Sequence, residues 1–430
     1  MELLSLLKHV EKEVGRVESL RYGPRAIDLD IIFYDSITFD NRKKGGDGSY
    51  DGELVIPHVR MCEREFVLRP LLECVLLFHH RFPSDMQHLA SSIIPNYVHP
   101  VHNISVRTLF NERLVHTPST AHKVLPFPSP PRHPDIPSTL WPLTLRTYLM
   151  ATINATPDSF SSSAPSTTAA AVDQALAAAD NGADIIDVGG YSTRPGATPV
   201  PVDEELSRVI PVVRMIRERG IVLPISIDTF RPAVLRAAVE VGANCLNDVT
   251  ALAGEEGNAV PWEMATVVRE LGVPVVMMHS RGAHRAGEYK DYGASGVLAG
   301  VQEELGQHVD YALRCGIRRW NILVDPGFGF SKTTADNAEL LRRFRDVTAT
   351  GEFGCRPNAL RNFPTLAGLS RKSFLGHLIG RKTEPQDRDL ATAAAVTAAV
   401  QQGADVVRVH QVAEIRDVLR IADAVWRKVR

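Results

Sequence analysis

The second half of the sequence repeats one arrangement, in which a short apolar run ends in polar or charged side chains. Three of these side chains, Asp228, Asn247 and Asp325, supply carboxylate and amide groups, and Lys372 supplies a cation. Carboxylate and amide oxygens accept hydrogen bonds from N–H groups, so this set suits the donor-rich edge of an aminopyrimidinone ring.

A second set of residues after apolar runs is rich in positive charge and hydrogen-bond donors. It contains Thr193, Arg194, Arg408 and His410. Guanidinium groups form strong charge-assisted hydrogen bonds with phosphate oxygens, so this set suits a diphosphate. Asn154 ends another apolar run and offers an oxygen ligand for Mg²⁺, a cation that proteins often share with substrate phosphates.

Each of these residues also has an ordinary structural interpretation. Asp228 could cap the helix that follows it, Asn247 with Asp248 could form an Asx turn, and Asp325 before Pro-Gly could open a turn. A functional site is favoured because the residues follow consecutive apolar runs. In a barrel of parallel strands the carboxyl ends of the strands meet at one mouth.

The elements that would bring these residues together follow from the alternation of apolar runs and helical patterns. Strands are predicted at residues 145–153, 183–188, 224–227, 244–247, 273–278, 321–324, 365–369 and 404–409. Helices are predicted at residues 168–181, 203–219, 231–241, 259–271, 296–315, 335–348, 389–402 and 412–427. Eight strand and helix pairs favour an α/β fold of the (β/α)8 TIM barrel type over an open doubly wound sheet. Gly182, Gly242 and Gly403 are expected to end helices before the next strand.

The beginning of the chain has a second candidate site. An amphipathic helix is predicted at residues 2–19, and a strand after it carries Asp28 and Asp30 on one face. Two carboxylates about 7 Å apart on such a strand repel each other unless a hard cation lies between them. Magnesium with a nucleotide phosphate fits this demand, and an edge strand with one wetted face is the alternative.

Composition narrows the classes of partner. The formal net charge of −2 argues against a nucleic-acid partner, and no apolar run approaches the roughly 18 residues of a membrane span. The five cysteines are widely spaced without any Cys-x-x-Cys pair, which is typical of reduced residues inside the cell. We therefore expect neither a nucleic acid nor a membrane as a partner, and a cytoplasmic protein.

Prolines between residues 118 and 142 predict a semi-extended spacer, since proline continues neither helices nor central strands. The predicted organisation is a first domain at residues 1–116, a proline-rich linker at 117–143 and a barrel at 144–430. Within the first domain, residues 40–52 are rich in glycine and charge and predict a hairpin loop.

Together, the motifs of the second region resemble those of dihydropteroate synthase. They include Ser192-Thr-Arg-Pro195, Asp325-Pro-Gly-Phe-Gly-Phe330-Ser-Lys332, Ser370-Arg-Lys372-Ser373 and Val407-Arg408-Val-His410. The resemblance implies a barrel that condenses p-aminobenzoate with 6-hydroxymethyl-7,8-dihydropterin diphosphate. A methyltetrahydrofolate methyltransferase is the alternative on the same barrel, and it should lack the first and third of these motifs.

The resemblance also implies a role for each candidate residue. The pterin would be bound by Asp228, Asn247, Asp325 and Lys372, with Met278 against the ring or as an ordinary core methionine. Diphosphate and its Mg²⁺ would be bound by Asn154, Thr193, Arg194, Arg408 and His410. The p-aminobenzoate would be bordered by Phe330, Pro195 and Ser373. The implied catalytic set is Lys372, Arg194, Asp325, Arg408 and His410.

The first region resembles 6-hydroxymethyl-7,8-dihydropterin pyrophosphokinase through Gly23-Pro-Arg25 and the two acids that follow. This resemblance implies that Asp28 and Asp30 hold magnesium and that Arg25, His58 and Arg64 face ATP. It further implies a partial α+β ferredoxin-like domain, because the family's N-terminal half has no counterpart before Met1. Kinase activity of this chain is therefore left open.

A pyrophosphokinase in front of a synthase resembles the multifunctional folate-synthesis proteins of fungi. The resemblance implies a homodimer that pairs through the late helices of the barrel, and a mitochondrial location if a presequence precedes residue 1. The alternative from another functional class is a catalytically impaired pterin-binding or scaffold protein, which would bind ligand without turnover.

Overall fold

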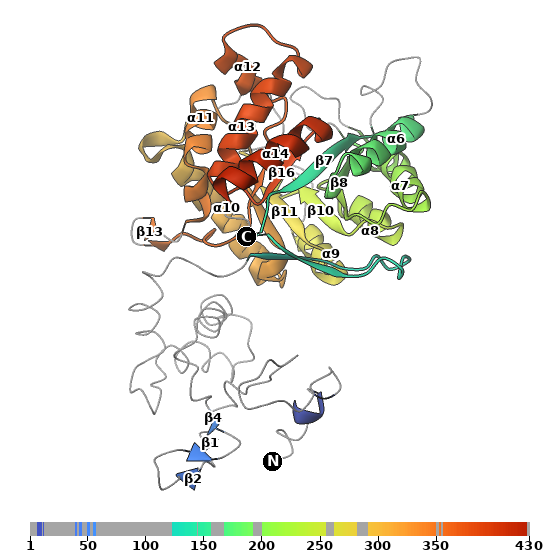
Figure 1. Cartoon of the computed structure of the whole chain (residues 1–430), viewed down its shortest axis with the longest axis vertical. Helices are drawn as coiled ribbons and strands as arrows, with labels where there is room; N and C mark the ends of the chain where they lie inside the picture. The colour runs from blue at the N-terminus through green and yellow to red at the C-terminus, as the bar shows by residue number, and fades with distance from the viewer. Residues whose placement is uncertain are drawn as a thin grey trace. The chain divides into compact units, whose positions relative to one another are not determined.

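The computed structural model divides into two compact units, Met1–Ser119 and Thr120–Arg430 (Figure 1). It describes residues 7–10, 12, 39–40, 43–44, 50–51, 55–56, 123–143, 145–155, 167–191, 200–254, 262–281, 291–349, 352–353 and 356–427. Several predictions fall outside these ranges. They are the ferredoxin-like arrangement of the first region and its site residues Arg25, Asp28, Asp30, His58 and Arg64.

In the first unit, residues 7–10 and 12 are helical and lie within the predicted helix. The strands described there form two antiparallel pairs. Strand β1 (Phe39–Asp40) pairs with β4 (Val55–Ile56), and β2 (Lys43–Lys44) pairs with β3 (Tyr50–Asp51). The two pairs form a nested hairpin around the segment where the sequence predicts one.

The second unit is a barrel of eight parallel strands, which confirms the predicted fold class. The strands are β7 (Tyr148–Asn154), β8 (Ile185–Gly189), β9 (Ile225–Asp228), β10 (Cys245–Asp248), β11 (Val275–Met278), β12 (Ile322–Asp325), β15 (Leu366–Ala367) and β16 (Val406–Val409). Strands β7 to β12 pair in sequence order, and β16 lies between β15 and β7. A parallel bridge between Val324 and Thr365 closes the ring. Each strand overlaps one of the predicted apolar runs.

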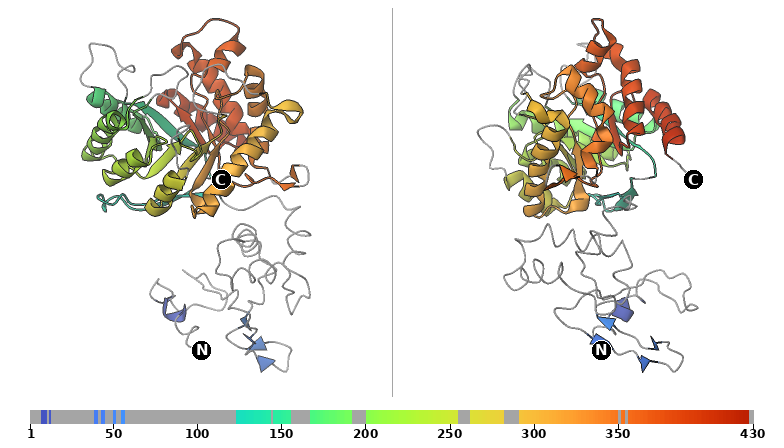
Figure 2. Two further views of the ribbon diagram at one scale, coloured as in Figure 1. Left: turned by 180° about the vertical axis from the view of Figure 1, so that it is seen from behind. Right: turned by 90° about the vertical axis from the view of Figure 1, so that its left-hand side faces the viewer.

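Helices surround the strands, as the views in Figures 1 and 2 show. They are α6 (Thr167–Asp180), α7 (Val202–Glu218), α8 (Pro232–Glu240), α9 (Trp262–Leu271), α10 (Gly296–Arg314), α11 (Thr334–Arg342), α12 (Ser373–Ile379), α13 (Asp389–Gln401) and α14 (Val412–Trp426). The predicted helix at 335–348 is α11 followed by a 3-10 turn, η7 (Phe344–Thr348), and α12 is an element that the sequence reading did not predict. None of the helices in the described ranges is long and apolar enough to cross a membrane.

The strands are apolar because they are covered on both faces. Residues of β8 to β12 are buried along their whole length, with the helices outside and the barrel interior inside. Helix α7 shows the matching pattern, since Val209, Val212, Val213 and Ile216 recur at helical spacing and are fully buried. The chain then returns to the sheet at glycines with positive φ, at Gly182, Gly242 and Gly403 as predicted.

The proline-rich segment is not a free spacer, and in this respect the structure differs from the prediction. Strands β5 (Val124–Phe127) and β6 (Thr139–Pro142) form an antiparallel hairpin. Leu125, Phe127 and Leu143 are buried in one apolar cluster with residues at the start of the barrel strands. The prolines lie mainly in the loop between the strands, where a missing N–H group costs no sheet hydrogen bond.

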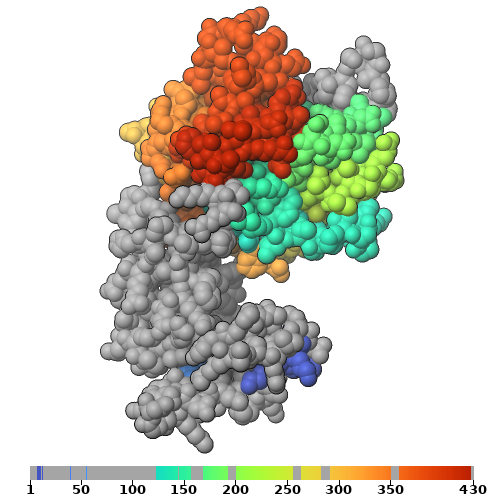
Figure 3. All heavy atoms as spheres, viewed as in Figure 1, coloured from blue at the N-terminus to red at the C-terminus, as the bar shows by residue number. Residues whose placement is uncertain are grey.

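This hairpin closes the amino-terminal end of the barrel, whereas α12 lies at the opposite end (Figures 1 and 2). The last turns of the C-terminal helix α14 are bound to the amino-terminal end of the barrel, where the hairpin also lies. The Asp423 carboxylate accepts hydrogen bonds from the backbone N–H of Thr147 at 2.9 Å and from its hydroxyl at 2.8 Å. Figure 3 shows α14, in dark red, bordering the hairpin and the start of β7, in teal. The other end of the barrel is therefore the one left open for a ligand.

Candidate active site

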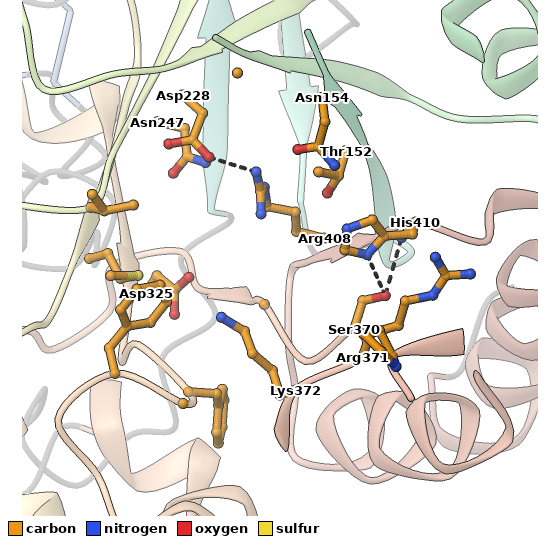
Figure 4. Close-up of a pocket in the computed structure, with 18 of the residues that line it drawn as sticks. Thr152, Asn154, Asp228, Asn247, Asp325, Ser370, Arg371, Lys372, Arg408 and His410 are labelled. Atoms are coloured by element: carbon orange, nitrogen blue, oxygen red, sulfur yellow. Dashed lines mark hydrogen bonds and ion pairs between the residues drawn. The ribbon is translucent and has the colours of Figure 1, made fainter. Parts of the chain in front are cut away.

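A cavity of about 410 Å³ opens at the carboxyl ends of the barrel strands (Figure 4). Its walls include ten of the residues singled out from the sequence, namely Asn154, Asp228, Asn247, Met278, Asp325, Phe330, Lys372, Ser373, Arg408 and His410. Thr193, Arg194 and Pro195 fall in residues 192–199, outside the described ranges. Residues from β7, β9, β10, β11, β12 and β16 thus meet in one place.

Strand register explains why these side chains share one mouth. In the sheet, Asp228 lies opposite both Gly189 and Asn247, and Met278 lies opposite Asp325. Asn154 in turn lies opposite Gly189. Because the strands are parallel and closely in register, their carboxyl ends meet at one mouth of the barrel.

Arg408 joins the carboxylates at the bottom of the cavity. Its Nε lies 2.6 Å from Oδ2 of Asp187, and one terminal nitrogen lies 2.7 Å from Oδ2 of Asp228. The amide nitrogen of Asn247 donates to the same oxygen of Asp187 at 3.1 Å. Burial raises the pKa of Asp228, and the Arg408 guanidinium opposes this shift. Asp187 therefore holds two of the candidate ligand-binding groups.

Asp325 lies on another wall of the cavity, and only 5% of its surface is exposed. Its Oδ1 accepts the backbone N–H of Gly327 at 2.7 Å. Burial raises the pKa of Asp325 to about 6, against the backbone hydrogen bond and the nearby cations, first of all Lys372. At neutral pH Asp325 is therefore a buried carboxylate that can accept hydrogen bonds.

Basic side chains occupy the remaining walls. Nζ of Lys372 lies 4.1 Å from the centroid of the Phe330 ring, within the range of a cation–π contact. Nδ1 of His410 lies 2.9 Å from the Ser370 hydroxyl, which also accepts the backbone N–H of His410 (Figure 4). Arg371 forms a bidentate ion pair with Asp389. This side of the cavity is arranged to meet negative charge.

An apolar patch completes the cavity. Phe230, Val249 and Met278 are buried together, and Tyr191 and Phe330 pack against them. The Tyr191 and Phe230 rings meet edge to face with centroids 5.4 Å apart. A flat aromatic ligand would find both a hydrophobic face and polar edges here.

The ordinary structural interpretations hold for some residues only. Asp248 does form an Asx turn, since its Oδ1 accepts the backbone N–H of Thr250 at 2.7 Å. Asp325 also anchors a turn, through Gly327. Asp228 does not cap a helix, because α8 has Arg231 at its N-cap without a side-chain cap bond. Asn247 bonds across the barrel to Asp187. Asp228 and Asn247 therefore serve the cavity, not a local turn.

Sequence reasoning did not single out Thr152 and Arg388, which line the cavity, or Asp187, which lies beneath it and binds Arg408. Asp187 had a usable signal, since it is a carboxylate inside a strand that is otherwise apolar. Its exposure is 0%, and its Oδ1 accepts no hydrogen bond among the described residues. Fully buried carboxylates with one unsatisfied oxygen are rare, so such a residue indicates a special environment.

The described residues contain no group of three or more His, Cys, Asp or Glu that could hold a metal ion by themselves. Asn154 is the half-buried oxygen donor that ends β7 and lines the cavity beside Arg408 and His410. Mg²⁺ commonly takes one or two protein oxygens together with phosphate oxygens and water. A single donor next to a cationic wall fits a metal that arrives with a diphosphate.

Comparison with known proteins identifies the family. Residues 150–410 match the family described as "Pterin binding enzyme", and residues 1–75 match "7,8-dihydro-6-hydroxymethylpterin-pyrophosphokinase (HPPK)". The folic acid synthesis protein fol1 of Pneumocystis carinii is 36% identical over 429 residues, which cover 100% of this chain and 51% of that protein. The chain thus spans about half the length of this fungal relative.

Shorter relatives match the barrel alone. The dihydropteroate synthase of Synechocystis is 37% identical over 298 residues, covering 68% of this chain and 96% of that protein. The structure of Xanthomonas albilineans dihydropteroate synthase with 4-aminobenzoic acid aligns with a TM-score of 0.58 and 42% identity, covering 66% of this chain and 95% of that one. The chain therefore belongs to the pterin binding enzymes and, among them, to the dihydropteroate synthase family.

Proposed function

We propose that the barrel condenses p-aminobenzoate with 6-hydroxymethyl-7,8-dihydropterin diphosphate to give 7,8-dihydropteroate and diphosphate. The observation that carries this proposal is the division of one cavity into a carboxylate and amide side, at Asp228, Asn247 and Asp325, and a cationic side, at Lys372, Arg408 and His410. A pterin diphosphate has the same division, with N–H donors on its ring and negative charge at its other end.

The pterin ring lies between the carboxylates in this proposal. Oδ1 of Asp228 is buried and accepts no hydrogen bond among the described residues, so a ring N–H can bind there. Asp325 offers its second carboxylate oxygen, while Lys372 donates to a ring carbonyl or nitrogen. A site that leaves buried acceptors without partners rejects molecules lacking the matching donors.

In this proposal the diphosphate lies against Arg408 and His410. Thr193 and Arg194, which follow β8 in the sequence, are further donors. Asn154 supplies the protein oxygen for Mg²⁺, which when bound neutralises charge on the leaving diphosphate. The main catalytic task of the chain is to stabilise that leaving charge, because the amine of p-aminobenzoate is already a neutral nucleophile near pH 7.

In this proposal p-aminobenzoate is bordered by Phe330, Ser373 and Pro195. Ser373 begins α12, and Phe330 presents its ring to the apolar patch of the cavity. In the reaction, the amine nitrogen forms a bond to the exocyclic methylene of the pterin while the bond from that carbon to the diphosphate oxygen breaks. The amine then loses one proton to solvent. Holding the two reactants in line supplies much of the rate enhancement.

The test uses the whole chain with isotopically labelled p-aminobenzoate, pterin diphosphate and Mg²⁺, and follows label in dihydropteroate. We expect product formation that requires both substrates and that a sulfonamide inhibits competitively with p-aminobenzoate. An Asp325→Asn variant is the matched control, since it keeps the side-chain size and removes the charge. Tight binding of pterin diphosphate without product would instead support a non-catalytic pterin-binding protein.

We propose a separate role for the first unit. Its match to the pyrophosphokinase family suggests ATP and 6-hydroxymethyl-7,8-dihydropterin as ligands, with Arg25, His58 and Arg64 for ATP and Asp28 and Asp30 for magnesium. A reaction started from ATP, the hydroxymethyl pterin and p-aminobenzoate tests whether this chain makes its own pterin diphosphate. Product only when pterin diphosphate is added would assign activity to the barrel alone.

We further propose that the barrel forms a homodimer through its late helices. Ile421, Val425 and Trp426 on α14 and Leu390 on α13 are 69%, 61%, 48% and 85% exposed. Large apolar side chains exposed on two helices that contact each other can form an association surface, and a second copy of the chain is the simplest occupant. Ile421→Asp should convert the dimer to a monomer in light scattering. A wild-type monomer would refute this proposal.

A further inference from the structure

A row of ionisable side chains lies behind the wall of the cavity, next to the loop that carries Phe330. Nζ of Lys332 lies 3.0 Å from Nδ1 of His279, and Nε2 of His279 lies 3.0 Å from Oε2 of Glu304 on α10. Glu304 also accepts hydrogen bonds from the Arg281 guanidinium. The proposed reaction above assigns no role to this row.

The protonation of the row follows from its geometry. Lys332 and His279 are each 3% exposed. Nδ1 of His279 faces the lysine, so it acts as the acceptor, and the Nε2 proton is donated to Glu304. Burial lowers the pKa of His279 to about 4, which keeps the imidazole neutral. Burial alone would raise the pKa of Glu304, but its hydrogen bonds to His279 and Arg281 lower it to about 2.

Lys332 uses its other two protons to hold the loop after β12. Nζ donates to the carbonyl oxygen of Gly327 at 2.9 Å and to that of Phe330 at 3.1 Å. With the acceptor on His279, these bonds satisfy all three protons of an ammonium group. Burial lowers the pKa of Lys332 to about 7, and the nearby carboxylates of Asp325 and Glu304 oppose this shift. A buried ammonium is expensive to desolvate, so it is retained where the groups around it compensate and where its bonds fix a structure.

The loop held in this way has little room to move. A Cβ at Gly327 would lie 2.0 Å from the backbone oxygen of His279, and one at Gly329 would lie 3.0 Å from the Lys372 side chain. Asn337 of α11 accepts the backbone N–H of Gly329 at 2.7 Å. The Phe330 ring at the end of the loop faces the Lys372 ammonium at 4.1 Å. Displacing the loop would therefore displace the Phe330 ring within the cavity.

We propose that Lys332, supported by His279 and Glu304, is a positioning residue that fixes the Phe330 loop for binding of p-aminobenzoate. This inference rests on the proposed synthase function and assigns the row to one of its two substrates. Lys332 touches neither substrate. It acts through the carbonyl groups of Gly327 and Phe330, so its loss should alter the p-aminobenzoate subsite more than the pterin subsite.

The first test is Lys332→Met, which keeps the length of the side chain and removes the charge and donors. Steady-state kinetics are measured at about pH 7, where Asp325, with a pKa of about 6, is mostly ionised and Lys332, with a pKa of about 7, still carries a large share of its ammonium form. We expect KM for p-aminobenzoate to rise about tenfold, with KM for pterin diphosphate changed less than about twofold. Equal increases in both constants would show a general structural role and overturn the proposal.

Amide hydrogen exchange provides a readout that does not depend on turnover. In Lys332→Met, exchange at residues 327–330 should be faster than in wild type, with the barrel strands unchanged. If the wild-type chain forms no dihydropteroate, the proposed function fails, yet the exchange data still decide whether Lys332 holds the loop. Unchanged exchange in the loop would overturn the inference even in an active enzyme.

A second variant protects the test against a misfolded lysine mutant. Glu304→Gln keeps an acceptor for His279 and removes the negative charge that supports the row. We expect a smaller change in the same direction, with KM for p-aminobenzoate raised about threefold. Glu303→Gln is the matched control, because Glu303 precedes Glu304 on α10 and is exposed, and it should behave as wild type. Equal effects of the two glutamine variants would contradict the proposal.

Discussion

Arg408 and Asp228 form an ion pair at the bottom of the cavity, with a nitrogen to oxygen distance of 2.7 Å (Figure 4). The same guanidinium is held at 2.6 Å by Asp187, a residue buried inside the barrel. The pair thus links the carboxylate side of the cavity to its cationic side. Any ligand that bridges the two sides meets groups whose positions depend on each other.

Asp187→Asn should impair the site although the residue lies beneath it. The change replaces the carboxylate that Arg408 and Asn247 share with a neutral amide, so the Arg408 guanidinium loses its charged partner. Losing a buried charge-assisted contact typically costs about 1 to 3 kcal/mol, so we expect kcat/KM for pterin diphosphate to fall about 10- to 100-fold. Circular dichroism should confirm that the barrel remains folded. An unchanged kcat/KM would contradict the positioning role of Asp187.

Lys372→Ala and Arg194→Ala should separate the two ends of the substrate. Lys372 is assigned to the ring, so its loss should weaken binding of a pterin with or without diphosphate by about tenfold. Arg194 is assigned to the diphosphate, so its loss should weaken only the diphosphate-bearing ligand. Titration calorimetry with both ligands measures the difference. Unchanged affinity of the lysine variant for the ring would count against its assignment.

Binding of the pterin ring should weaken in mild acid. Burial raises the pKa of Asp325 to about 6, so below that pH the carboxyl gains a proton and no longer accepts a ring N–H as a carboxylate. Burial also raises the pKa of Asp228, the other carboxylate assigned to the ring, to about 7. Affinity should therefore be constant above about pH 8 and fall as pH drops through about 7 and 6. A pterin without diphosphate is the appropriate ligand, because it has no phosphate group that could titrate in the same pH range. Affinity that is flat down to about pH 5 would refute the assignment.

The hairpin at the amino-terminal end should stabilise the barrel. Phe127 is 1% exposed and packs against Trp141 with ring centroids 4.7 Å apart. Phe127→Ala should lower the free energy of unfolding by about 3 to 5 kcal/mol. Leu140→Ala on the same hairpin is the control, since Leu140 is 63% exposed and its loss should change stability by less than about 0.5 kcal/mol. The measurement is thermal unfolding of the ligand-bound protein. If Phe127→Ala and Leu140→Ala change its midpoint equally, the hairpin does not belong to the folding unit of the barrel.

The sequence predicted the barrel well because its strands are covered on both faces and its helices are amphipathic. It predicted the cavity residues because polar groups at strand ends have few structural uses. The hairpin was less visible, since its prolines suggested a spacer. Only burial in the structure shows that Leu125 and Phe127 alternate inward. Helix α12 was not predicted for another reason, because its seven residues are too few to show a helical pattern.

Asp187 and Lys332 were missed for a different reason. Asp187 interrupts an apolar strand and Lys332 ends a recognised motif, but their partners lie far along the chain, Arg408 for Asp187 and His279 for Lys332. Sequence spacing carries information about faces of an element, but not about which elements become neighbours around a closed barrel. Residues that act through others in this way are found only when the fold is known.

The most direct measurement follows dihydropteroate and diphosphate in the same reaction of the purified whole chain. With pterin diphosphate, p-aminobenzoate and Mg²⁺, the two products should appear in equal amounts, because forming the carbon–nitrogen bond is what releases the diphosphate. Diphosphate released without dihydropteroate, or substrate bound without either product, would contradict the assignment of this cavity as a synthase active site.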